Sequence, residues 1–280
     1  MQTLTLSRQG LPRAILELAR AECLQRHLLA CTQSALGAAR SRGCDVALHF
    51  QPDDWVGGDY VDVVPLPCGR VFFALADVCG KGMSSAMIAA GLWSSVRCLL
   101  ADGADLAGLM DRLNAHLFAT LPSGFVTMFA ATLYPATGEM WYVNAAHHPA
   151  WLLAPDSSRR LVGEDADVPL GIDTEEFREQ YAKLAPGDLL ALYTDGCIDR
   201  AGSDGRPLDS ADLAHMIADV RGNAEAPLQA VADRLADRLI EMEALARGHG
   251  VNHDDSTLLL LRLRGGARAV TPHAMRLDEP

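Results

Sequence analysis

Hydrophobic residues recur at helical spacing near the start of the chain. Between residues 11 and 40, leucine and isoleucine side chains return once per helical turn or nearly so, which predicts a helix. Pro12 suits its first turn, and Gly43 ends the pattern. Residues 46 to 50 then alternate apolar and polar side chains before Pro52, which predicts a short strand.

Short runs rich in β-branched and aromatic residues dominate the middle of the chain. Two pairs of them flank tight turns, at Pro67-Cys68-Gly69 and at Pro135-Ala136-Thr137-Gly138, and each pair predicts an antiparallel hairpin. We expect a further run to continue the second hairpin, and two others to flank the turn at residues 185 to 188. Antiparallel sheets are therefore a main component. The predicted strands are residues 56–67, 70–78, 125–134, 139–146, 150–153, 177–184, 188–193 and 258–263.

Four further segments read as helices. Ser84 is a suitable N-cap for an alanine-rich run over residues 85 to 100. That run is apolar nearly all round, so we expect it to be buried against a sheet. Residues 105 to 121 place a row of leucines on one face, and residues 210 to 220 and 227 to 247 also have helical spacing.

Composition narrows the class of protein. The 280 residues carry 24 Lys and Arg against 36 Asp and Glu, a formal net charge of −12, which argues against nucleic-acid binding and against attachment to anionic membranes. No apolar run suggests a membrane span, and the N-terminus lacks a secretory signal pattern. The seven cysteines show no Cys-x-x-Cys pair or zinc-ligand spacing. We therefore expect a cytoplasmic protein.

Four aspartates stand at glycine-flanked ends of predicted strands: Asp59, Asp77, Asp195 and Asp254. A single Asp-Gly at a strand end is usually a turn residue. Four such strand ends together indicate a candidate metal site, because carboxylate oxygens suit hard divalent ions such as Mg²⁺ and Mn²⁺.

Bringing these carboxylates together requires positive charge. Two unit charges 4 Å apart repel by about 4 kcal/mol at an effective dielectric constant of 20. Two divalent ions would balance four carboxylates and could lower the pKa of a water for attack on phosphorus. The spacing along the chain does not show that the four side chains converge.

An ordered set of short motifs resembles the SpoIIE-type, RsbU-like branch of the PPM metal-dependent Ser/Thr protein phosphatases. The resemblance covers about residues 45 to 263. The motifs are Gly57-Gly58-Asp59-Tyr60-Val61-Asp62, Ala76-Asp77-Val78-Cys79-Gly80-Lys81-Gly82, Phe125-Val126-Thr127, Asn144-Ala145-Ala146-His147-His148-Pro149, Pro169-Leu170-Gly171-Ile172, Pro186-Gly187-Asp188, Tyr193-Thr194-Asp195-Gly196 and Asp254-Asp255-Ser256-Thr257.

The resemblance implies an α+β fold, a four-layer α-β-β-α sandwich in which helices flank two antiparallel sheets. It also implies a division of the chain. Residues 1–42 would be an N-terminal helical linker or regulatory segment, residues 43–264 the phosphatase domain, and residues 265–280 a flexible C-terminal tail. We see no composition break that marks a second domain.

The resemblance further implies a site for Mn²⁺ or Mg²⁺, with two ions expected. Asp77 would bridge both ions, and Asp59 with the backbone carbonyl of Val78 would serve one of them. Asp195 and Asp254 would hold the other, while Asp255 matches a position ranked below Asp254 as a ligand. Ala146-His147-His148 stands where the family usually has Gly-His-Asn.

Lys81 and His147 are candidate catalytic residues, each with a structural alternative. Lys81 could meet a phosphate oxygen, or it could point into solvent from the turn before a helix. His147 could donate a proton, or it could be a hydrogen-bonded histidine that orients a loop. His253 we interpret as a neighbour of Asp254, because alternate residues on a strand face opposite ways.

The predicted function is hydrolysis of phosphoserine or phosphothreonine in a regulatory phosphoprotein, such as an anti-sigma-factor antagonist of the STAS type. A regulator could act through the N-terminal helix, or that helix could form a homodimer. Two alternatives stay open. The chain could be a non-catalytic binding module of the same fold, or a metal-dependent hydrolase of small phosphoesters.

Overall fold

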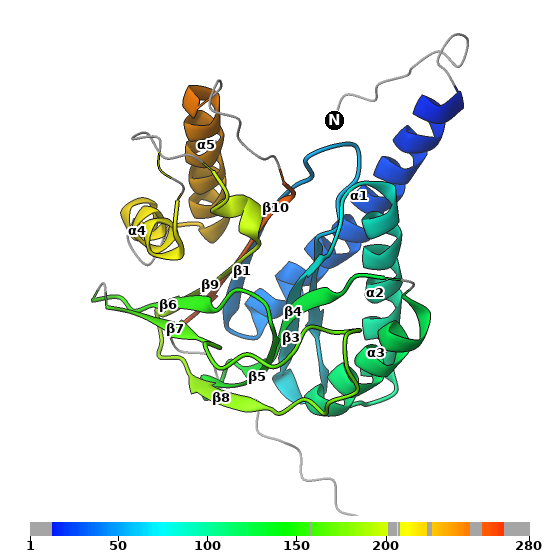
Figure 1. Cartoon of the computed structure of the whole chain (residues 1–280). Coiled ribbons are helices and arrows are strands. Elements are labelled where there is room, and N and C mark those ends of the chain that lie inside the picture. The colour runs from blue at the N-terminus through cyan, green and yellow to red at the C-terminus, as the bar shows by residue number, and fades with distance from the viewer. Residues whose placement is uncertain are drawn as a thin grey trace, which may run out of the picture.

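The computed structural model describes residues 13–265, except residues 122, 157, 201–205, 207, 223–225 and 247–253. Two five-stranded antiparallel sheets stack face to face (Figure 1). Sheet one has the strand order β1-β10-β9-β6-β7, and sheet two has the order β2-β3-β4-β5-β8. The strands are β1 (Cys44–Gln51), β2 (Tyr60–Pro65), β3 (Val71–Val78), β4 (Val126–Tyr134), β5 (Glu139–Ala145), β6 (Ala150–Leu153), β7 (Arg159–Val162), β8 (Gln180–Lys183), β9 (Leu189–Tyr193) and β10 (Ser256–Leu263).

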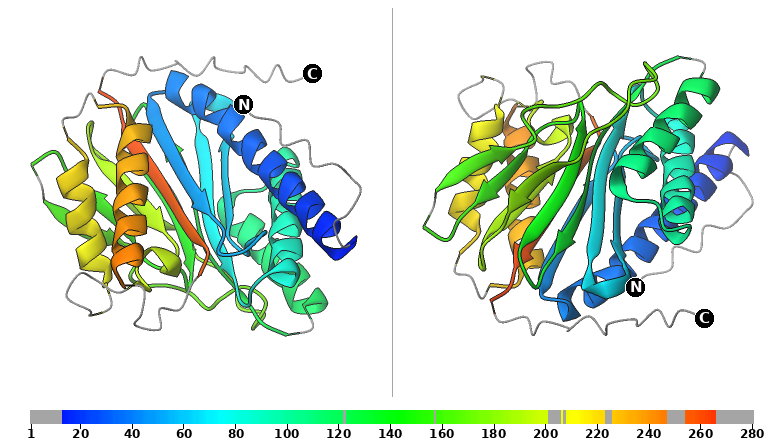
Figure 2. Two further views of the ribbon diagram at one scale, coloured as in Figure 1. Left: turned by 90° about the horizontal axis from the view of Figure 1, so that it is seen from above. Right: turned by 90° about the horizontal axis from the view of Figure 1, so that it is seen from below.

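Helices cover the outer face of each sheet (Figure 2). Helices α2 (Met83–Ala101) and α3 (Leu106–Thr120) pack on sheet two, and α4 (Ser210–Val220) and α5 (Leu228–Ala246) pack on sheet one. Inward-facing residues of both sheets, among them Phe73, Phe129 and Leu259, form the central core. The predicted α-β-β-α sandwich is thereby confirmed.

The predicted N-terminal helix forms as α1 (Arg13–Ser41). It lies along the open side of the sandwich, against β1 of sheet one and β2 of sheet two. Thr32 on α1 is buried and donates to the carboxylate of Asp62 on β2, 2.8 Å away. Asp62 also receives two hydrogen bonds from Arg97 on α2. A buried polar network therefore joins α1, sheet two and α2.

Local patterns predicted several elements closely. The hairpin of β2 and β3 has the expected turn at residues 67–69, and α4 has the predicted bounds. In α3 all the leucines of the predicted face are buried, and the Asp105 carboxylate caps the helix by accepting from the Gly108 amide.

The strands differ from the sequence prediction in two places. Strand β6 does not continue the hairpin of β4 and β5 but pairs with β7 and β9 in sheet one. Strand β7 is absent from the predicted strands, because its short Arg-Arg-Leu-Val sequence gives little periodicity. Strands β8 and β9 flank the turn at residues 185–188, as predicted, and they belong to different sheets.

Helix α2 also differs from its prediction. Its N-cap is Gly82, which lacks a side chain, so Ser84 is not the cap and lies within the first turn. The helix buries only the face that meets sheet two, and Met87 is 69% exposed. By length and hydropathy α2 could cross a membrane, contrary to expectation, although helices packed on a protein core pass the same test.

Candidate functional site

The four aspartates come from strand ends that lie at one edge of the sandwich. Asp59 directly precedes β2 and Asp77 is the penultimate residue of β3, and these strands pair with Tyr60 opposite Ala76. Asp195 follows β9 and Asp254 precedes β10, and these strands pair with Tyr193 opposite Leu258. Antiparallel pairing thus places two carboxylates on each sheet at the same end.

Three of the four line one pocket of about 300 Å³, which we call the carboxylate pocket. Asp77 enters it from sheet two, and Asp195 and Asp254 enter it from sheet one. Val78 and the loop 79–81 form one wall, and residues 146–148 form another. The structure therefore brings together side chains that lie up to 177 positions apart, from Asp77 to Asp254.

Asp59 lies next to this pocket but is not among its lining residues. Only 4% of its surface is exposed, and one carboxylate oxygen accepts from the hydroxyls of Thr194 at 2.9 Å and Thr257 at 2.5 Å. Burial raises the pKa of Asp59 well above its ordinary value, and the charges of Asp77 and Asp255 add to this. The two threonines belong to sheet one, so Asp59 also links the two sheets.

Asp255 is occupied by backbone amides. Its two oxygens accept from the amide of Asp53 at 2.8 Å and from that of Gly58 at 2.6 Å. A Cβ at Gly57 would lie 2.5 Å from the same carboxylate, so a side chain there would displace the carboxylate from these amides. Asp255 therefore positions the loop that ends at Asp59, and its predicted role as a ligand finds no support in this arrangement.

The electrostatics of the carboxylate pocket favour a cation. Burial raises the pKa of Asp77 to about 7, with further contributions from the charges of Asp195 and Asp254. Burial also raises the pKa of Asp195, and Asp254 adds to that shift. A cation in the carboxylate pocket would reduce the repulsion between these carboxylates.

The donors fit Mg²⁺ or Mn²⁺ by type, because carboxylate and carbonyl oxygens are the ligands these ions prefer. Among the described residues, however, no group of three or more His, Cys, Asp or Glu side chains is spaced to hold a single ion. The carboxylates therefore line the same pocket, but they do not converge on one point. His253 lies outside the described residues.

Lys81 contacts the site directly. Its ammonium lies 2.8 Å from a carboxylate oxygen of Asp254, and its side chain is 46% exposed. The two flanking glycines have positive φ angles, 106° at Gly80 and 73° at Gly82, which L-residues rarely adopt. The loop therefore carries Lys81 over the pocket instead of into open solvent.

His147 fits the structural interpretation better than the catalytic one. It is 4% exposed, and its Nδ1 lies 2.8 Å from the hydroxyl of Thr127. Burial, with the charge of His148, lowers its pKa to about 3, so the ring is neutral near pH 7. The Asn144 side chain accepts from the His147 amide and donates to its carbonyl, both at 2.9 Å.

The turn that presents His147 holds a residue in an unfavourable conformation. Ala146 has a φ of 52°, a left-handed backbone angle that costs a residue with a Cβ about 1 kcal/mol. We expect Ala146→Gly to raise the free energy of unfolding by about 1 kcal/mol in urea denaturation. Ala38→Gly, at an exposed position of α1, should lower it by about the same amount. A loss of stability in Ala146→Gly would contradict the strained turn.

Sequence reasoning missed several residues of the site. Thr194 and Thr257 hold Asp59, Asn144 holds the turn, and His148 lines the carboxylate pocket and stacks on Tyr193 with ring centroids 5.5 Å apart. All of them stand within the quoted motifs. Small polar residues beside a motif carboxylate were the signal that could have identified the threonines.

Comparison with known proteins agrees with the site. The family model for Stage II sporulation protein E (SpoIIE) matches residues 67–264. The phosphoserine phosphatase RsbP of Bacillus subtilis is 26% identical over 161 residues, which cover 55% of this chain and 40% of RsbP. The matched regions cover less than half the length of the curated relatives RsbP and IcfG, a protein of Synechocystis sp..

Two solved structures share the fold. The RsbU and RsbW domains of Rv1364c from Mycobacterium tuberculosis are 31% identical with a TM-score of 0.65, covering 79% of this chain and 60% of that one. The SiaA-PP2C domain of Pseudomonas aeruginosa is 21% identical with a TM-score of 0.73, covering 88% and 96%. The motifs, the sandwich and the family match agree, and the chain belongs to the SpoIIE family, in the RsbU-like branch of the PPM-type protein phosphatases.

Proposed function

We propose that this protein is a metal-dependent phosphatase that removes phosphate from phosphoserine or phosphothreonine in a regulatory phosphoprotein. The observation that supports this most strongly is the carboxylate pocket, where Asp77 from one sheet meets Asp195 and Asp254 from the other. A cluster of acids is costly without cations, and divalent ions bound to carboxylates are suited to phosphate chemistry.

The proposed ligands follow the order predicted from the sequence. Asp77 would serve both ions, Asp59 and the Val78 carbonyl would serve one of them, and Asp195 and Asp254 would serve the other. Bound there, Mn²⁺ or Mg²⁺ supplies positive charge for phosphate oxygens and lowers the pKa of a water that attacks phosphorus. For Asp59 to act as a ligand, its free oxygen must turn toward the pocket while the threonines keep the other.

Other residues of the protein position the loops of the site and contact the substrate. Asp255 fixes the loop before Asp59 through the amides of Asp53 and Gly58. Lys81, which is paired with Asp254 at the pocket edge, exchanges that carboxylate for an oxygen of the substrate phosphate. Asn144 and Thr127 hold His147, which keeps the opposite wall of the pocket in place.

Lys81→Met tests the proposed phosphate contact. Because Lys81 is 46% exposed, water screens its charge and the loss should be moderate. We expect KM for a phosphoprotein to rise about 10-fold, with a smaller change in kcat. Lys183→Met, which removes an exposed lysine from β8, is the control. An unchanged KM would show that Lys81 does not contact the substrate phosphate.

A partner of the STAS type is the proposed substrate. It is supported by the similarity to RsbP, which is named a phosphoserine phosphatase, and to the RsbU domain of Rv1364c, which shares its chain with an RsbW domain. A regulator or a second copy could act through α1, because the Gln25 side chain bonds both the amide and the carbonyl of Gly57, at 3.1 and 2.7 Å. Movement of α1 would therefore reach the loop before Asp59.

Phosphate release separates the proposal from its alternatives. The protein is incubated with a phosphorylated STAS-domain protein and with p-nitrophenyl phosphate, with Mn²⁺, with Mg²⁺ and with chelator. We expect metal-dependent release from the phosphoprotein at a kcat/KM well above that for the small ester. Activity on the small ester alone would favour a small-phosphoester hydrolase. No release from either would favour a non-catalytic binding module.

A further inference from the structure

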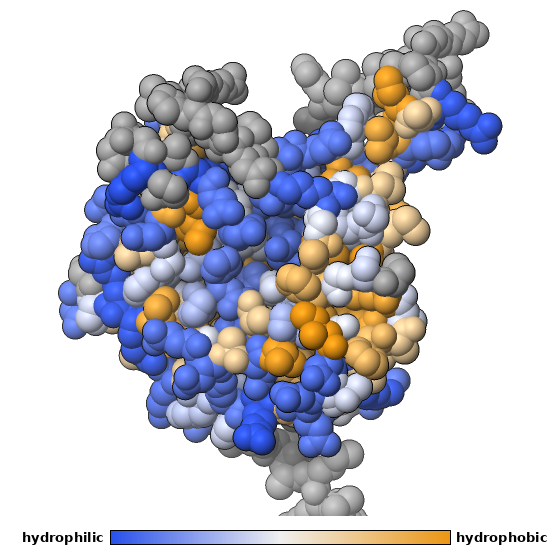
Figure 3. All heavy atoms as spheres, in the orientation of Figure 1, coloured by the Kyte–Doolittle hydropathy of each residue, from blue (hydrophilic) through white to orange (hydrophobic). Residues whose placement is uncertain are grey.

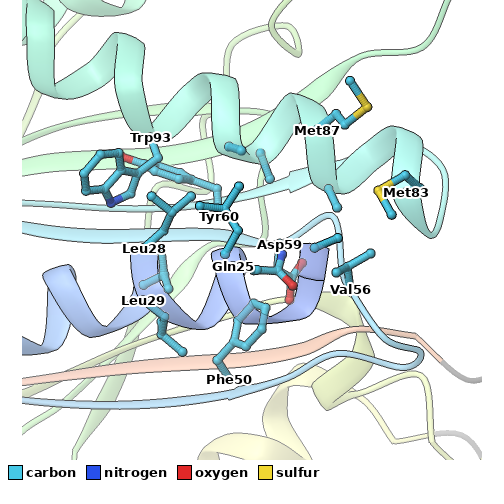
Figure 4. A pocket seen from close by; sticks show the side chains of 16 residues that line it. Gln25, Leu28, Leu29, Phe50, Val56, Asp59, Tyr60, Met83, Met87 and Trp93 are labelled. Atoms are coloured by element: carbon cyan, nitrogen blue, oxygen red, sulfur yellow. The ribbon is translucent and has the colours of Figure 1, made fainter. Parts of the chain in front are cut away.

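A second pocket lies between α1 and α2, above the start of β2 (Figure 4). We call it the helix pocket. One wall is formed by Leu24 and Leu28 of α1, and the other by Met83 and Met87 of α2. The pocket has a volume of about 170 Å³, which is below the range of about 300 to 1,000 Å³ typical of sites for drug-sized molecules, so its occupant must be small.

The mouth of the helix pocket is built from exposed apolar side chains. Leu24 is 57% exposed, Met83 38% and Met87 69%. Figure 3 shows that apolar residues gather on the side of the molecule formed by α1, α2 and α3. Methionine side chains are flexible and polarizable, so they adapt to an apolar ligand of variable shape.

Two hydrogen-bond donors among the residues that line this pocket lack partners. The hydroxyl of Tyr60 and the indole N–H of Trp93 are buried, and neither has a hydrogen-bond partner within the part of the chain that the structure describes. Figure 4 shows the two side chains toward one end of the pocket, with Val56 and Met83 toward the other. A buried donor left unpaired costs about 1 to 3 kcal/mol, so native structures rarely leave one without an explanation.

Two charged groups that act on Tyr60 and Trp93, Asp62 and Arg97, are paired with each other. The Arg97 guanidinium lies 4.3 Å from the centre of the Trp93 ring and donates to both oxygens of Asp62. Burial raises the pKa of Tyr60 well above its ordinary value, and the charge of Asp62 adds to this. The tyrosine hydroxyl therefore stays protonated, and both groups are hydrogen-bond donors without an acceptor among the described residues.

We propose that the helix pocket binds a small acyl-chain compound whose chain lies between α1 and α2 and whose terminal oxygen accepts from Tyr60 and Trp93. An elongated, flexible chain matches a pocket with leucines on one wall and methionines on the other. Its acceptor head would lie at the end of the pocket where the Tyr60 and Trp93 side chains are found (Figure 4).

Binding is tested on the full chain with two probes below their micelle-forming concentrations, sodium decanoate and decanamide, by isothermal titration calorimetry. We expect saturable binding of at least one probe at a single site. Decanoate alone would identify a carboxylate head, decanamide alone a neutral head, and both results support the site. No saturable binding of either probe would overturn the proposal.

Variants locate the binding. Leu28→Trp and the milder Ala90→Leu each fill the pocket and should weaken binding at least 10-fold. Tyr60→Phe and Trp93→Phe each remove one donor while keeping the apolar ring, and each should weaken binding about 5- to 10-fold. Trp141→Phe on β5, where the ring is 42% exposed, is the matched control and should bind as the wild type does. Circular dichroism checks that each variant is folded. Wild-type binding in both filled variants, or in both donor variants, would contradict the assigned site.

Discussion

Asp77→Asn should lower kcat for metal-dependent phosphate release by about a thousand-fold, equal to about 4 kcal/mol at 1.36 kcal/mol per factor of ten. The amide keeps the size of the side chain but removes the charge at the place where the carboxylates of both sheets meet. The loss of this one charge weakens the binding of every ion that Asp77 serves. The measurement is the rate of phosphate release from a phosphoserine protein at saturating Mn²⁺.

The same substitution should leave the fold intact or make it slightly more stable. Burial and the charges of neighbouring acids raise the pKa of Asp77 to about 7, so the ionised form is strained in the absence of ions and an amide removes that strain. Asp165→Asn, at an exposed loop position, is the control for both activity and stability. Full activity in Asp77→Asn would show that this carboxylate is not part of the site.

Gly196→Ala should damage both stability and activity. Gly196 follows Asp195, and a Cβ there would lie 2.1 Å from the backbone carbonyl oxygen of Asp255. Backbone cannot move aside as a flexible side chain can, so the turns that carry Asp195 and Asp254 must separate. Overpacking of this kind costs about 1 to 3 kcal/mol, and we expect the upper end of that range.

The measurements for Gly196→Ala are urea unfolding and the Mn²⁺ concentration that gives half-maximal activity, which should rise at least 10-fold. Gly91→Ala on α2 is the matched control, because an added Cβ there meets no atom within 4 Å. That variant should be unchanged or slightly more stable. If Gly196→Ala behaved like Gly91→Ala, close contact between these two turns would not be required.

Elements with a regular pattern of buried and exposed residues could be predicted from the sequence. Helix α3 has its leucines on one buried face and an aspartate cap, so local spacing determines it. The hairpin of β2 and β3 follows from a turn between two apolar runs. Helix α2 was harder to predict, because it carries more apolar residues than the face that packs on the sheet can bury. The remaining apolar residues form one wall of the helix pocket.

Pairings between distant segments could not be predicted from local patterns. Strand β6 follows β5 closely in the chain, yet it joins the other sheet because the turn at residues 145–149 redirects the backbone, with Ala146 in a left-handed conformation. The approach of Asp195 and Asp254 to Asp77 likewise depends on the stacking of the two sheets. Only the family resemblance predicted that convergence, and the threonines that hold Asp59 were not foreseen.

The central claim is that carboxylates from both sheets hold divalent ions in one pocket. Its most direct test is the anomalous scattering of Mn²⁺ in crystals of this protein grown with manganese. The account predicts manganese peaks in direct contact with Asp77 and with at least one of Asp195 and Asp254. Manganese bound only at other surface acids, with these three side chains in contact with no ion, would contradict it.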